Sequence, residues 1–268
     1  MHLQRLTHAR LSKTNAKAQF VDITHAKPAV ATQFLEEADW NVDNALREYY
    51  NQNPPQDPKV GAIFDKYRSP EDKDIISIDG TLEYLSDLGF DPEELLSLTL
   101  AYVLESPQTG EFHRDAFVRV WSTLSINTLE GMRQHVVQKQ KAMDSSVEEF
   151  EPFYQFVFEF VRGSDTRIKV IGFEESVIYW QMLLDTRFPA SKERLQQWYE
   201  FIEETKKSIT RDSWNMFFKF LVQVVEKDPS SLSAYDEASA WPSVVDEYME
   251  WLEENGKLQT SEDTAMIN

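Results

Sequence analysis

A proline-rich break divides this chain into a short and a long part. The segment 51–58, NQNPPQDP, holds three prolines and no aliphatic or aromatic side chain. Proline interrupts helices and strand ladders, and a segment without apolar side chains has nothing to bury. We therefore predict a semi-rigid linker at 52–58, between a small unit at 15–51 and a large unit at 59–255, with disordered tails at 1–14 (basic) and 256–268.

The charge and the missing cysteines narrow the class of protein. A formal net charge of −19 over 268 residues disfavours nucleic acid and favours basic protein partners. Without cysteine there is no disulfide, no thiolate nucleophile and no Cys-based zinc site. The five histidines are scattered, so no metal or cofactor is predicted. No apolar run approaches the roughly 20 residues of a membrane span, and no secretory signal opens the chain. We expect a non-catalytic binding protein of the cytoplasm, the nucleus or both.

Helical spacing of apolar residues continues almost without a break from Lys59 onward, which predicts an all-α fold. In DPEELLSLTLAYVLES, Asp91 is the expected N-cap, with Pro92 at the first helical position and Glu94 completing a capping box. Two extended stretches, DIISIDG at 74–80 and RIKVIGF at 167–173, are expected to pair with each other as one brief sheet.

The small unit carries the pattern of three short helices. Pro28 stands at an expected helix start, and Asn41 is the expected N-cap of the third helix. The run ATQFLEEADWNVDNALREYY, at 31–50, resembles the second and third helices of a ubiquitin-associated (UBA) domain, with Trp40 as a core residue. The resemblance implies a ubiquitin-binding site in the loop after the first helix and at the end of the third, here formed by Thr24, His25, Ala26, Tyr49 and Tyr50.

Two loops of the large unit have the outline of EF-hands without their ligands. In SPEDKDIISIDGTLEYL, the central apolar position falls on Ile78, which puts Glu71, Lys73 and Ile75 at ligand positions. Calcium needs six to eight oxygen ligands, and this loop cannot supply them. The loop ESPQTGEFHRDAF fails for the same reason. We predict EF-hand-like pairs that keep the helical geometry and bind no calcium.

The run SAYDEASAWPSVVDEYMEW, at 233–251, combines four aromatic side chains and five carboxylates with no lysine or arginine. Pro242 disfavours helical geometry in the residue before it and suits the start of the helix after it. This arrangement indicates a corner at which Trp241 packs inward while the carboxylates form a charged rim. On charge alone, a solvated helical face is the simpler interpretation.

Several segments, in order, resemble the potentiating-neddylation (PONY) domain of the defective-in-cullin-neddylation family. They span residues 60–253 and are ISIDGTLEYLSDLGFDPEE, GEFHRDAF, FYQFVFEFVR, VIYWQMLLDTRF, ITRDSWNMFFKF and YDEASAWPSVVDEYMEW. A UBA-like unit ahead of a PONY domain is the arrangement of the family's fungal branch. The resemblance implies a scaffold-type ligase without an active site of its own. Its partners would be the C-terminal domain of a cullin and the N-acetylated conjugating enzyme for the ubiquitin-like modifier Nedd/Rub.

The resemblance also carries site residues onto this chain by motif. The family's acidic cullin surface corresponds to Asp212 in RDSWN, Ala240 in SAWP and Asp246 in VVDEY. Thr81 and Ser97 stand where larger apolar residues are usual in the family's animal members. In this family, acetylation of the conjugating enzyme's N-terminus matters because it removes a charge that would be costly to bury in an apolar pocket. The family's pocket for the acetylated N-terminal methionine corresponds to Ile78, Leu82, Leu98, Leu100, Ala101, Leu104, Phe112, Phe160, Tyr179 and Met182.

Two other functions stay open. A ubiquitin-binding adaptor would act through the UBA-like unit, and the isolated segment 59–268 would then neither bind a cullin nor promote its modification. An acid–base enzyme would need a proton-sharing partner beside a carboxylate pair such as Asp236 and Glu237. The sequence places no histidine or lysine near that pair, which makes this function the weakest of the three.

Overall fold

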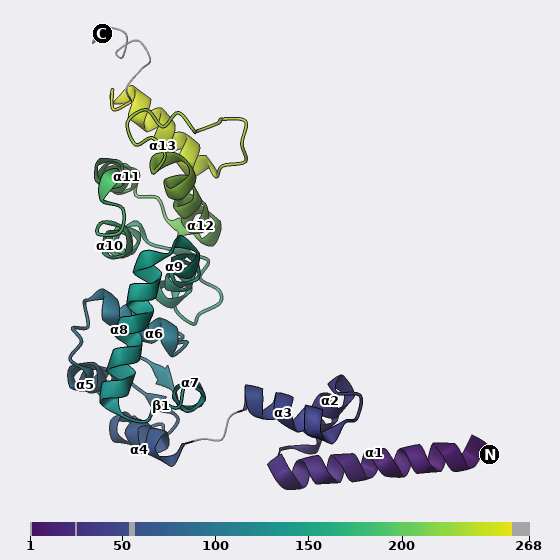
Figure 1. The fold of residues 1–268 in the computed structure, drawn as a ribbon. Coiled ribbons are helices and arrows are strands. Elements are labelled where there is room, and N and C mark those ends of the chain that lie inside the picture. The colour runs from purple at the N-terminus through teal and green to yellow at the C-terminus, as the bar shows by residue number, and fades with distance from the viewer. Residues whose placement is uncertain (1, 25, 54–56, 259–268) are drawn as a thin grey trace. The chain divides into compact units, whose positions relative to one another are not determined.

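The computed structural model describes residues 2–24, 26–53 and 57–258, except the side chains of residues 2–12 and 51 (Figure 1). These residues form helices almost throughout, and the prediction of an all-α fold is confirmed. The chain divides into two compact units, one formed by residues 1–63 with 118–127 and the other by residues 64–117 with 128–268. No helix of the described part has the length and apolar character needed to cross a membrane.

The first unit is built on three helices, α1 (His2–Thr24), α2 (Pro28–Glu37) and α3 (Val42–Gln52). Two predicted helix starts are confirmed. Pro28 is the first residue of α2, and Asn41 Oδ1 accepts a 3.0 Å hydrogen bond from the Asn44 amide at the start of α3. Trp40 and Tyr49 pack against the core. The predicted three-helix UBA-like unit is thus confirmed, with a buried core of Ala16, Phe20, Ala31, Phe34, Leu35 and Ala45.

Helix α1 differs from the prediction at its N-terminal end. The disordered tail predicted at 1–14 is wrong for the described backbone, because α1 begins at His2. Residues 1–27 contain neither glycine nor proline, so no residue interrupts the helix before Pro28. The prediction relied on the basic charge of this segment, and charge alone does not prevent a helix from forming.

The boundary between the two units also differs from the one predicted at residue 59. Residues 54–56 of the predicted linker lie outside the described residues, and α4 (Pro58–Tyr67) begins directly after Asp57. The Asp57 amide donates a 3.0 Å hydrogen bond to Ser122 Oγ, and Asn127 Nδ2 donates to Asp57 Oδ2 at 2.9 Å. The bond from Asn127 lowers the pKa of the Asp57 carboxyl. These contacts explain why residues 118–127 group with the first unit.

The second unit contains most of the helices, with α8 (Leu129–Ser145) and α9 (Val147–Arg162) running through its middle (Figure 1). Helices α5 (Ile78–Leu88) and α6 (Leu95–Val103) pack against α8, and α10 (Phe173–Leu184) and α12 (Arg211–Phe220) pack against α9. The unit also contains α11 (Lys192–Thr205), α13 (Ser243–Glu254), a 3-10 turn at Pro189–Ser191 and a π-helical turn at Leu221–Val225. Helices α4 and α7 (Arg114–Thr123) each have residues in both units.

Two short sheets join the loops of the second unit in pairs. Strand β1 (Ile75–Ile76) pairs antiparallel with β2 (Phe112–His113), and β3 (Val170–Ile171) pairs with β4 (Ile209–Thr210). The predicted pairing of 74–80 with 167–173 is therefore wrong. Each stretch pairs instead with the next loop along the chain, as in two consecutive EF-hand-like pairs. Among the described residues, no three His, Asp or Glu side chains gather in a way that could hold a metal ion.

An aromatic and polar core fixes α9 against α10 and α12. Tyr154 OH donates a 2.9 Å hydrogen bond to the Trp214 carbonyl, and Trp214 Nε1 donates to the Tyr154 carbonyl at 2.9 Å. Trp180 Nε1 donates to Tyr154 OH at 2.8 Å. Complete burial raises the pKa of Tyr154, which stays a neutral donor. A buried polar cluster that is fully hydrogen-bonded favours a single packing arrangement.

The folded part of the chain continues past residue 256, where the second disordered tail is predicted to begin. Lys257 Nζ forms a 2.8 Å ion pair with Glu200. The Lys257 carbonyl accepts a 2.8 Å hydrogen bond from Arg194, a buried side chain of α11. A backbone group held in this way belongs to the folded unit, so the predicted tail starts too early. Residues 259–268 lie outside the described residues.

Candidate functional site

An apolar pocket opens in the second unit between elements that are far apart in the sequence. Its walls come from α5, α6, β2, α9 and α10, and from the loops that precede α6 and β2. Its volume is about 110 Å³, and it is lined by Ile78, Thr81, Leu82, Leu85, Pro92, Glu94, Ser97, Leu98, Ala101, Ser106, Thr109, Gly110, Phe112, Phe160, Tyr179 and Met182.

Most of the residues predicted for a methionine pocket lie in this one. Eight of the ten line it, namely Ile78, Leu82, Leu98, Ala101, Phe112, Phe160, Tyr179 and Met182. Ile78 and Leu82 are 51% and 43% exposed, so they form an open edge above a buried floor. Leu100 and Leu104 do not line the pocket, and their assignment to it is wrong. Both are buried in the core instead, where they are 0% and 1% exposed.

The start of α6 also differs from the predicted capping box. The helix begins at Leu95, and Glu94 precedes it without a side-chain cap. Asp91 Oδ1 accepts a 2.9 Å hydrogen bond from the Glu93 amide, and the Asp91 carbonyl accepts one from Ser97 Oγ at 2.6 Å. Residues 91–94 therefore form a separate turn, which contributes to the pocket wall.

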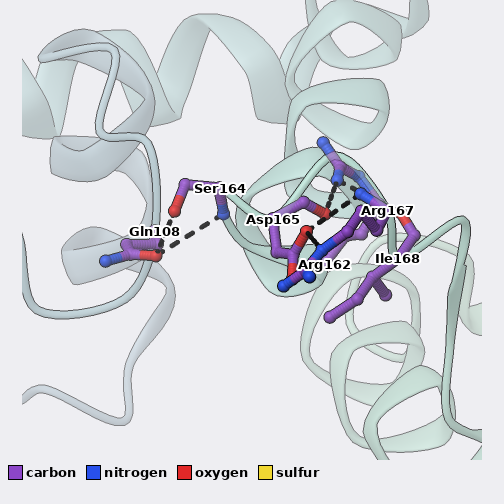
Figure 2. Close-up of polar contacts among 6 residues, drawn as sticks. All are labelled: Gln108, Arg162, Ser164, Asp165, Arg167 and Ile168. Carbon is purple, nitrogen blue, oxygen red and sulfur yellow. Dashed lines mark hydrogen bonds and ion pairs between the residues drawn. The ribbon is translucent and has the colours of Figure 1, made fainter.

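One side of the pocket is closed by a loop, residues 105–111, that is attached to a second loop at 163–168 (Figure 2). Ser164 Oγ donates a 3.0 Å hydrogen bond to Gln108 Oε1, a contact that we call the rim latch. Gly110 has a φ of +73°, and a side chain there would meet Ile78 Cδ1 at 2.5 Å. The first loop can therefore approach α5 only because residue 110 is glycine.

Arg162 holds the second loop in place at the end of α9 (Figure 2). Its Nη1 donates hydrogen bonds of 2.9 and 3.2 Å to the carbonyls of Asp165 and Ile168. Its Nη2 forms a 2.8 Å ion pair with Glu159. Arg167 pairs with the Asp165 carboxylate at 2.7 Å and lowers the pKa of that carboxyl. The rim latch is thus anchored to a loop with several internal bonds.

The acidic surface, formed by Asp212, Ala240 and Asp246, lies at the C-terminal end of the second unit. Asp212 is exposed in the first turn of α12, Ala240 is exposed in the loop before α13, and Asp246 lies in the first turn of α13. Helices α12 and α13 pack against each other (Figure 1). Tyr235 OH donates a 2.7 Å hydrogen bond to Asp246 Oδ1, and its pKa is raised by burial and by that carboxylate.

The corner before α13 explains why aromatic and acidic side chains occur together there. The Trp241 ring packs edge-on against Phe220, at 5.7 Å between ring centroids, and Tyr235 contacts the same ring at 6.3 Å. Pro242 stands directly before the first residue of α13. The aromatic side chains thus attach the loop to α12 while Ala240 stays exposed.

A buried arginine fixes the other end of the same loop. Arg194 of α11 is 6% exposed. Its guanidinium donates hydrogen bonds of 2.5 Å to the carbonyls of Pro229 and Ser230, and one of 2.8 Å to Lys257. A guanidinium presents five donors in a fixed geometry, so one side chain can hold several backbone segments together.

Asp228 organises the first residues of this loop. Its carboxylate accepts hydrogen bonds from the amides of Ser230 and Ser231, at 3.2 and 3.1 Å, and from the hydroxyls of Ser230, Ser231 and Ser233. These bonds, led by the one from the Ser231 hydroxyl, hold the pKa of Asp228 far below its usual range. An ionised Asp228 is therefore part of the loop's structure.

Two family models match the chain, and their ranges do not overlap. The model described as a UBA-like domain matches residues 15–56, and the model described as cullin binding matches residues 131–251. The second range contains the whole acidic surface and the part of the pocket contributed by α9 and α10.

Curated relatives match over most of their length and most of this chain. The defective in cullin neddylation protein 1 of Yarrowia lipolytica is 38% identical, over 86% of this chain and 93% of its own. The protein of that name from Candida albicans is 32% identical, over 90% of this chain and 97% of its own. This chain belongs to the defective-in-cullin-neddylation family. The Saccharomyces cerevisiae member is 26% identical over 88% of this chain and 92% of its own.

The UBA-like unit of this family member has its predicted ubiquitin-binding residues in different environments. Thr24 Oγ1 accepts a 3.2 Å hydrogen bond from the Ala26 amide. Tyr50 is exposed, and its hydroxyl donates to the Ile23 carbonyl at 3.2 Å. Tyr49 packs on the core, where it serves the fold. The predicted residue His25 lies outside the described residues.

Sequence reasoning missed several residues that shape the two sites of this family member. Leu85, Pro92 and Thr109 also line the pocket, and Arg194 and Asp228 hold the loop of the acidic surface. Leu85 follows Thr81 and Leu82 at helical spacing on α5, which is a signal that could have found it. The contacts of Arg194 join residues more than 30 positions apart, and no local pattern indicates them.

Proposed function

We propose that this chain is a non-catalytic scaffold that promotes cullin neddylation by holding two partners at once. The observation that carries the proposal is that one compact unit presents an apolar pocket and an acidic surface on different elements. The family's name and the cullin-binding model support a cullin as the partner of the acidic surface. A negative surface on a chain of net charge −19 suits a basic surface of that cullin.

The pocket suits the N-acetylated first residue of the conjugating enzyme for Nedd/Rub. Leu98, Phe112 and Phe160 give it a buried apolar floor, so a ligand gains free energy by burying an apolar side chain. Such burial contributes about 1.5–3 kcal/mol. A free N-terminal amine would bring an unpaired positive charge into the same apolar space, which is strongly unfavourable. The pocket therefore favours a neutral, capped N-terminus.

Transfer of the modifier would be accelerated by proximity and orientation. The chain has no cysteine that could carry the modifier. The covalent steps would therefore stay with the conjugating enzyme and the lysine of the cullin. The scaffold raises the effective concentration of each partner near the other, which accelerates transfer without a new catalytic group.

A reconstituted transfer reaction with separate variants for each site tests this proposal. Leu82→Asp should abolish binding of the capped conjugating enzyme and leave cullin binding intact. Ala240→Arg should do the reverse, because it adds bulk and the wrong charge to an exposed position. Both should remove the acceleration of cullin modification. If either variant still accelerates transfer like the wild type, the two-partner scaffold is wrong.

Matched controls separate these effects from a general loss of folding. Ile178→Asp is the control for Leu82→Asp, because it places the same charge at another exposed aliphatic residue. Ile178 is 56% exposed and does not line the pocket. Ala190→Arg makes the same change as Ala240→Arg at an exposed position in the 3-10 turn. Both control variants should bind both partners and accelerate transfer normally.

A ubiquitin-binding role of the UBA-like unit is a second candidate, supported by the exposed pair Ile23 and Tyr50 beside the predicted loop. Titration of ubiquitin into the full chain tests it. Tyr50→Ala should weaken that binding without changing cullin modification. If ubiquitin binds equally well to this variant, the carried-over residues are wrong. If removal of the UBA-like unit abolishes cullin binding, the adaptor becomes the better description of the whole chain.

A further inference from the structure

Three buried residues with hydroxyl groups line the apolar pocket, and two of the hydroxyls are already hydrogen-bonded. Ser97 Oγ donates to the Asp91 carbonyl at 2.6 Å, and the single hydroxyl proton of Ser106 is shared between two carbonyls of its own loop, at 2.8 and 2.6 Å from Oγ. Thr81 Oγ1 has no hydrogen-bond partner among the described residues. Thr81, Ser97 and Ser106 are 6%, 9% and 4% exposed, so a difference in burial does not explain the contrast.

Thr81 does not use the acceptor that lies one turn earlier on its own helix. On α6, Thr99 Oγ1 donates a 2.9 Å hydrogen bond to the Leu95 carbonyl four residues earlier, whereas the Ser77 carbonyl accepts only the 2.8 Å bond from the Thr81 amide among the described residues. A buried hydroxyl without a partner destabilises a folded protein, and native structures contain few of them. A valine has nearly the same shape and would avoid this cost. The hydroxyl is therefore a group whose partner is expected to come from a ligand.

A capped N-terminal residue brings the complementary group. Its acyl carbonyl oxygen enters the pocket with the apolar side chain, and a buried carbonyl needs a donor. The pocket hydroxyls of Ser97 and Ser106 already donate to backbone carbonyls. Thr109 is exposed and Tyr179 is half-buried, so their hydroxyls lie nearer to water. Thr81 is the buried hydroxyl of the lining that has a proton to give.

We propose that Thr81 is a specificity-determining residue that recognises the amide of an N-acylated N-terminus. In this proposal, the Thr81 hydroxyl, which is shielded from solvent in the free chain, turns toward the pocket when the ligand binds and donates a hydrogen bond to the acyl carbonyl oxygen. The inference rests on the proposed function of the pocket and extends it. Acetylation then matters for two reasons, since it removes a charge and also supplies the acceptor that Thr81 needs. An N-terminus that is merely uncharged binds less well than an acylated one.

Two peptides separate the charge from the acceptor. Both carry the N-terminal sequence of the conjugating enzyme. In one, the first methionine is acetylated, and in the other it lacks its amino group, so that it is uncharged and has no acyl carbonyl. Titration into the full wild-type chain should give the acetylated peptide an affinity about two- to tenfold higher, the usual effect of one neutral hydrogen bond. Thr81→Val should remove this difference by weakening only the acetylated peptide. Thr81→Ser keeps a hydroxyl and should restore it.

The thermal unfolding midpoint of the free chain distinguishes ligand recognition by Thr81 from a merely structural role. A structural role predicts that Thr81→Val lowers the midpoint. Thr81→Val removes a buried hydroxyl without a partner, so its midpoint should rise while its affinity falls. Ser97→Ala removes a pocket hydroxyl that is already bonded to Asp91. This matched control should lower the midpoint and change the affinities of both peptides by the same factor.

Each outcome of this experiment decides something. If Thr81→Val weakens both peptides equally, or leaves the preference for the acetylated peptide unchanged, the assignment of Thr81 is wrong. A lower unfolding midpoint for Thr81→Val would show that the hydroxyl is bonded within the protein, which also overturns it. If neither peptide binds the wild-type chain, the proposed function of the pocket fails first, and the inference fails with it.

Discussion

The apolar pocket and the acidic surface belong to the same compact unit and share few physical properties. The pocket is concave, draws its walls from seven segments between residues 78 and 182, and has a buried floor of carbon atoms. The acidic surface is exposed at Asp212 and Ala240 and half-buried at Asp246, and its loop is held by the Arg194 guanidinium at one end and by packing on Phe220 at the other. The pocket is built by the packing of distant segments, whereas the acidic surface depends on one loop that is held by polar contacts at one end and by aromatic packing at the other.

This difference indicates how each site recognises its partner. Burial of apolar area supplies free energy that depends little on salt, whereas a charged surface contributes mainly to the association rate and to orientation. For the proposed scaffold, the pocket would supply binding free energy for one partner, and the acidic surface would orient the other. The comparison can be tested site by site.

The largest expected effect is the loss of peptide binding when the acetyl group is replaced by a free amine. A free ammonium group in the pocket would lie against Leu98, Phe112 and Phe160, and the charged residue of the lining, Glu94, is exposed to water and not part of the buried floor. Burying such a charge costs several kcal/mol, so the affinity should fall by about two orders of magnitude or more. Isothermal titration of the acetylated peptide and of the peptide with a free amine measures the ratio of their affinities. Cullin binding, titrated with either peptide present, should not change. Equal affinities would mean that the pocket is not the binding site.

A second test uses salt to separate the two sites. Raising monovalent salt from about 50 to about 200 mM should weaken cullin binding by about tenfold and the capped peptide by less than twofold. Asp212→Asn and Asp246→Asn should each reduce the salt dependence for the cullin. Asn at 246 can still accept the hydrogen bond from Tyr235, so only the charge is lost. Asp115→Asn removes an exposed carboxylate of α7 and should leave the salt dependence unchanged. A similar salt dependence for both ligands would contradict the comparison.

Helix starts could be predicted from the sequence where neighbouring residues decide them. Pro28 and Asn41 act within one turn of their own helix, so their roles follow from local chemistry. Asp91 matched a capping box equally well, yet its carbonyl bonds to Ser97, six residues later, and the helix begins at Leu95. The local pattern predicted a helix start at Asp91 as it did at Pro28 and Asn41. The tertiary arrangement of the turn, and not the pattern, decided where the helix begins.

The pocket shows where sequence periodicity stops being informative. Helix α6, LLSLTLAYV, is apolar on more than one face, so periodicity cannot say which face meets the pocket. Leu98 and Ala101 line it, and Leu100 and Leu104 lie in the core. The family resemblance assigned residues from segments that are far apart in the sequence to one pocket. Which of these residues line the pocket could be resolved only from the three-dimensional packing.

A smaller effect is expected from cutting the rim latch. Gln108→Ala removes the acceptor for Ser164, together with the 2.9 Å hydrogen bond from Gln108 Nε2 to Glu111, and so loosens the loop that closes one side of the pocket. One neutral hydrogen bond is worth about 0.5–1.5 kcal/mol, so the capped peptide should bind about two- to tenfold more weakly. Cullin binding should stay the same. Gln155→Ala is the matched control, because Gln155 is exposed and bonds only to Glu151 on its own helix. An equal loss in both variants would exclude a specific role of the latch.

The smallest effect concerns the loop of the acidic surface at low pH. The folded state holds the pKa of Asp228 below the value of about 3.9 that an aspartate has in an unfolded chain. The contribution of its carboxylate to loop structure is therefore fully present above that unfolded value and is lost as pH falls through the lower folded value. The amide resonances of Ser230 and Ser231, recorded by NMR between pH 7 and pH 2, should move only in the acidic part of this range. Asp228→Asn should abolish the movement and leave the pocket's peptide affinity at pH 7 unchanged. Asp57→Asn, which removes another carboxyl of lowered pKa from the first unit, should leave the two serine resonances as they are in the wild type. If those resonances titrate with an ordinary aspartate midpoint, Asp228 does not hold the loop, and the acidic surface is positioned by Arg194 and the aromatic corner alone.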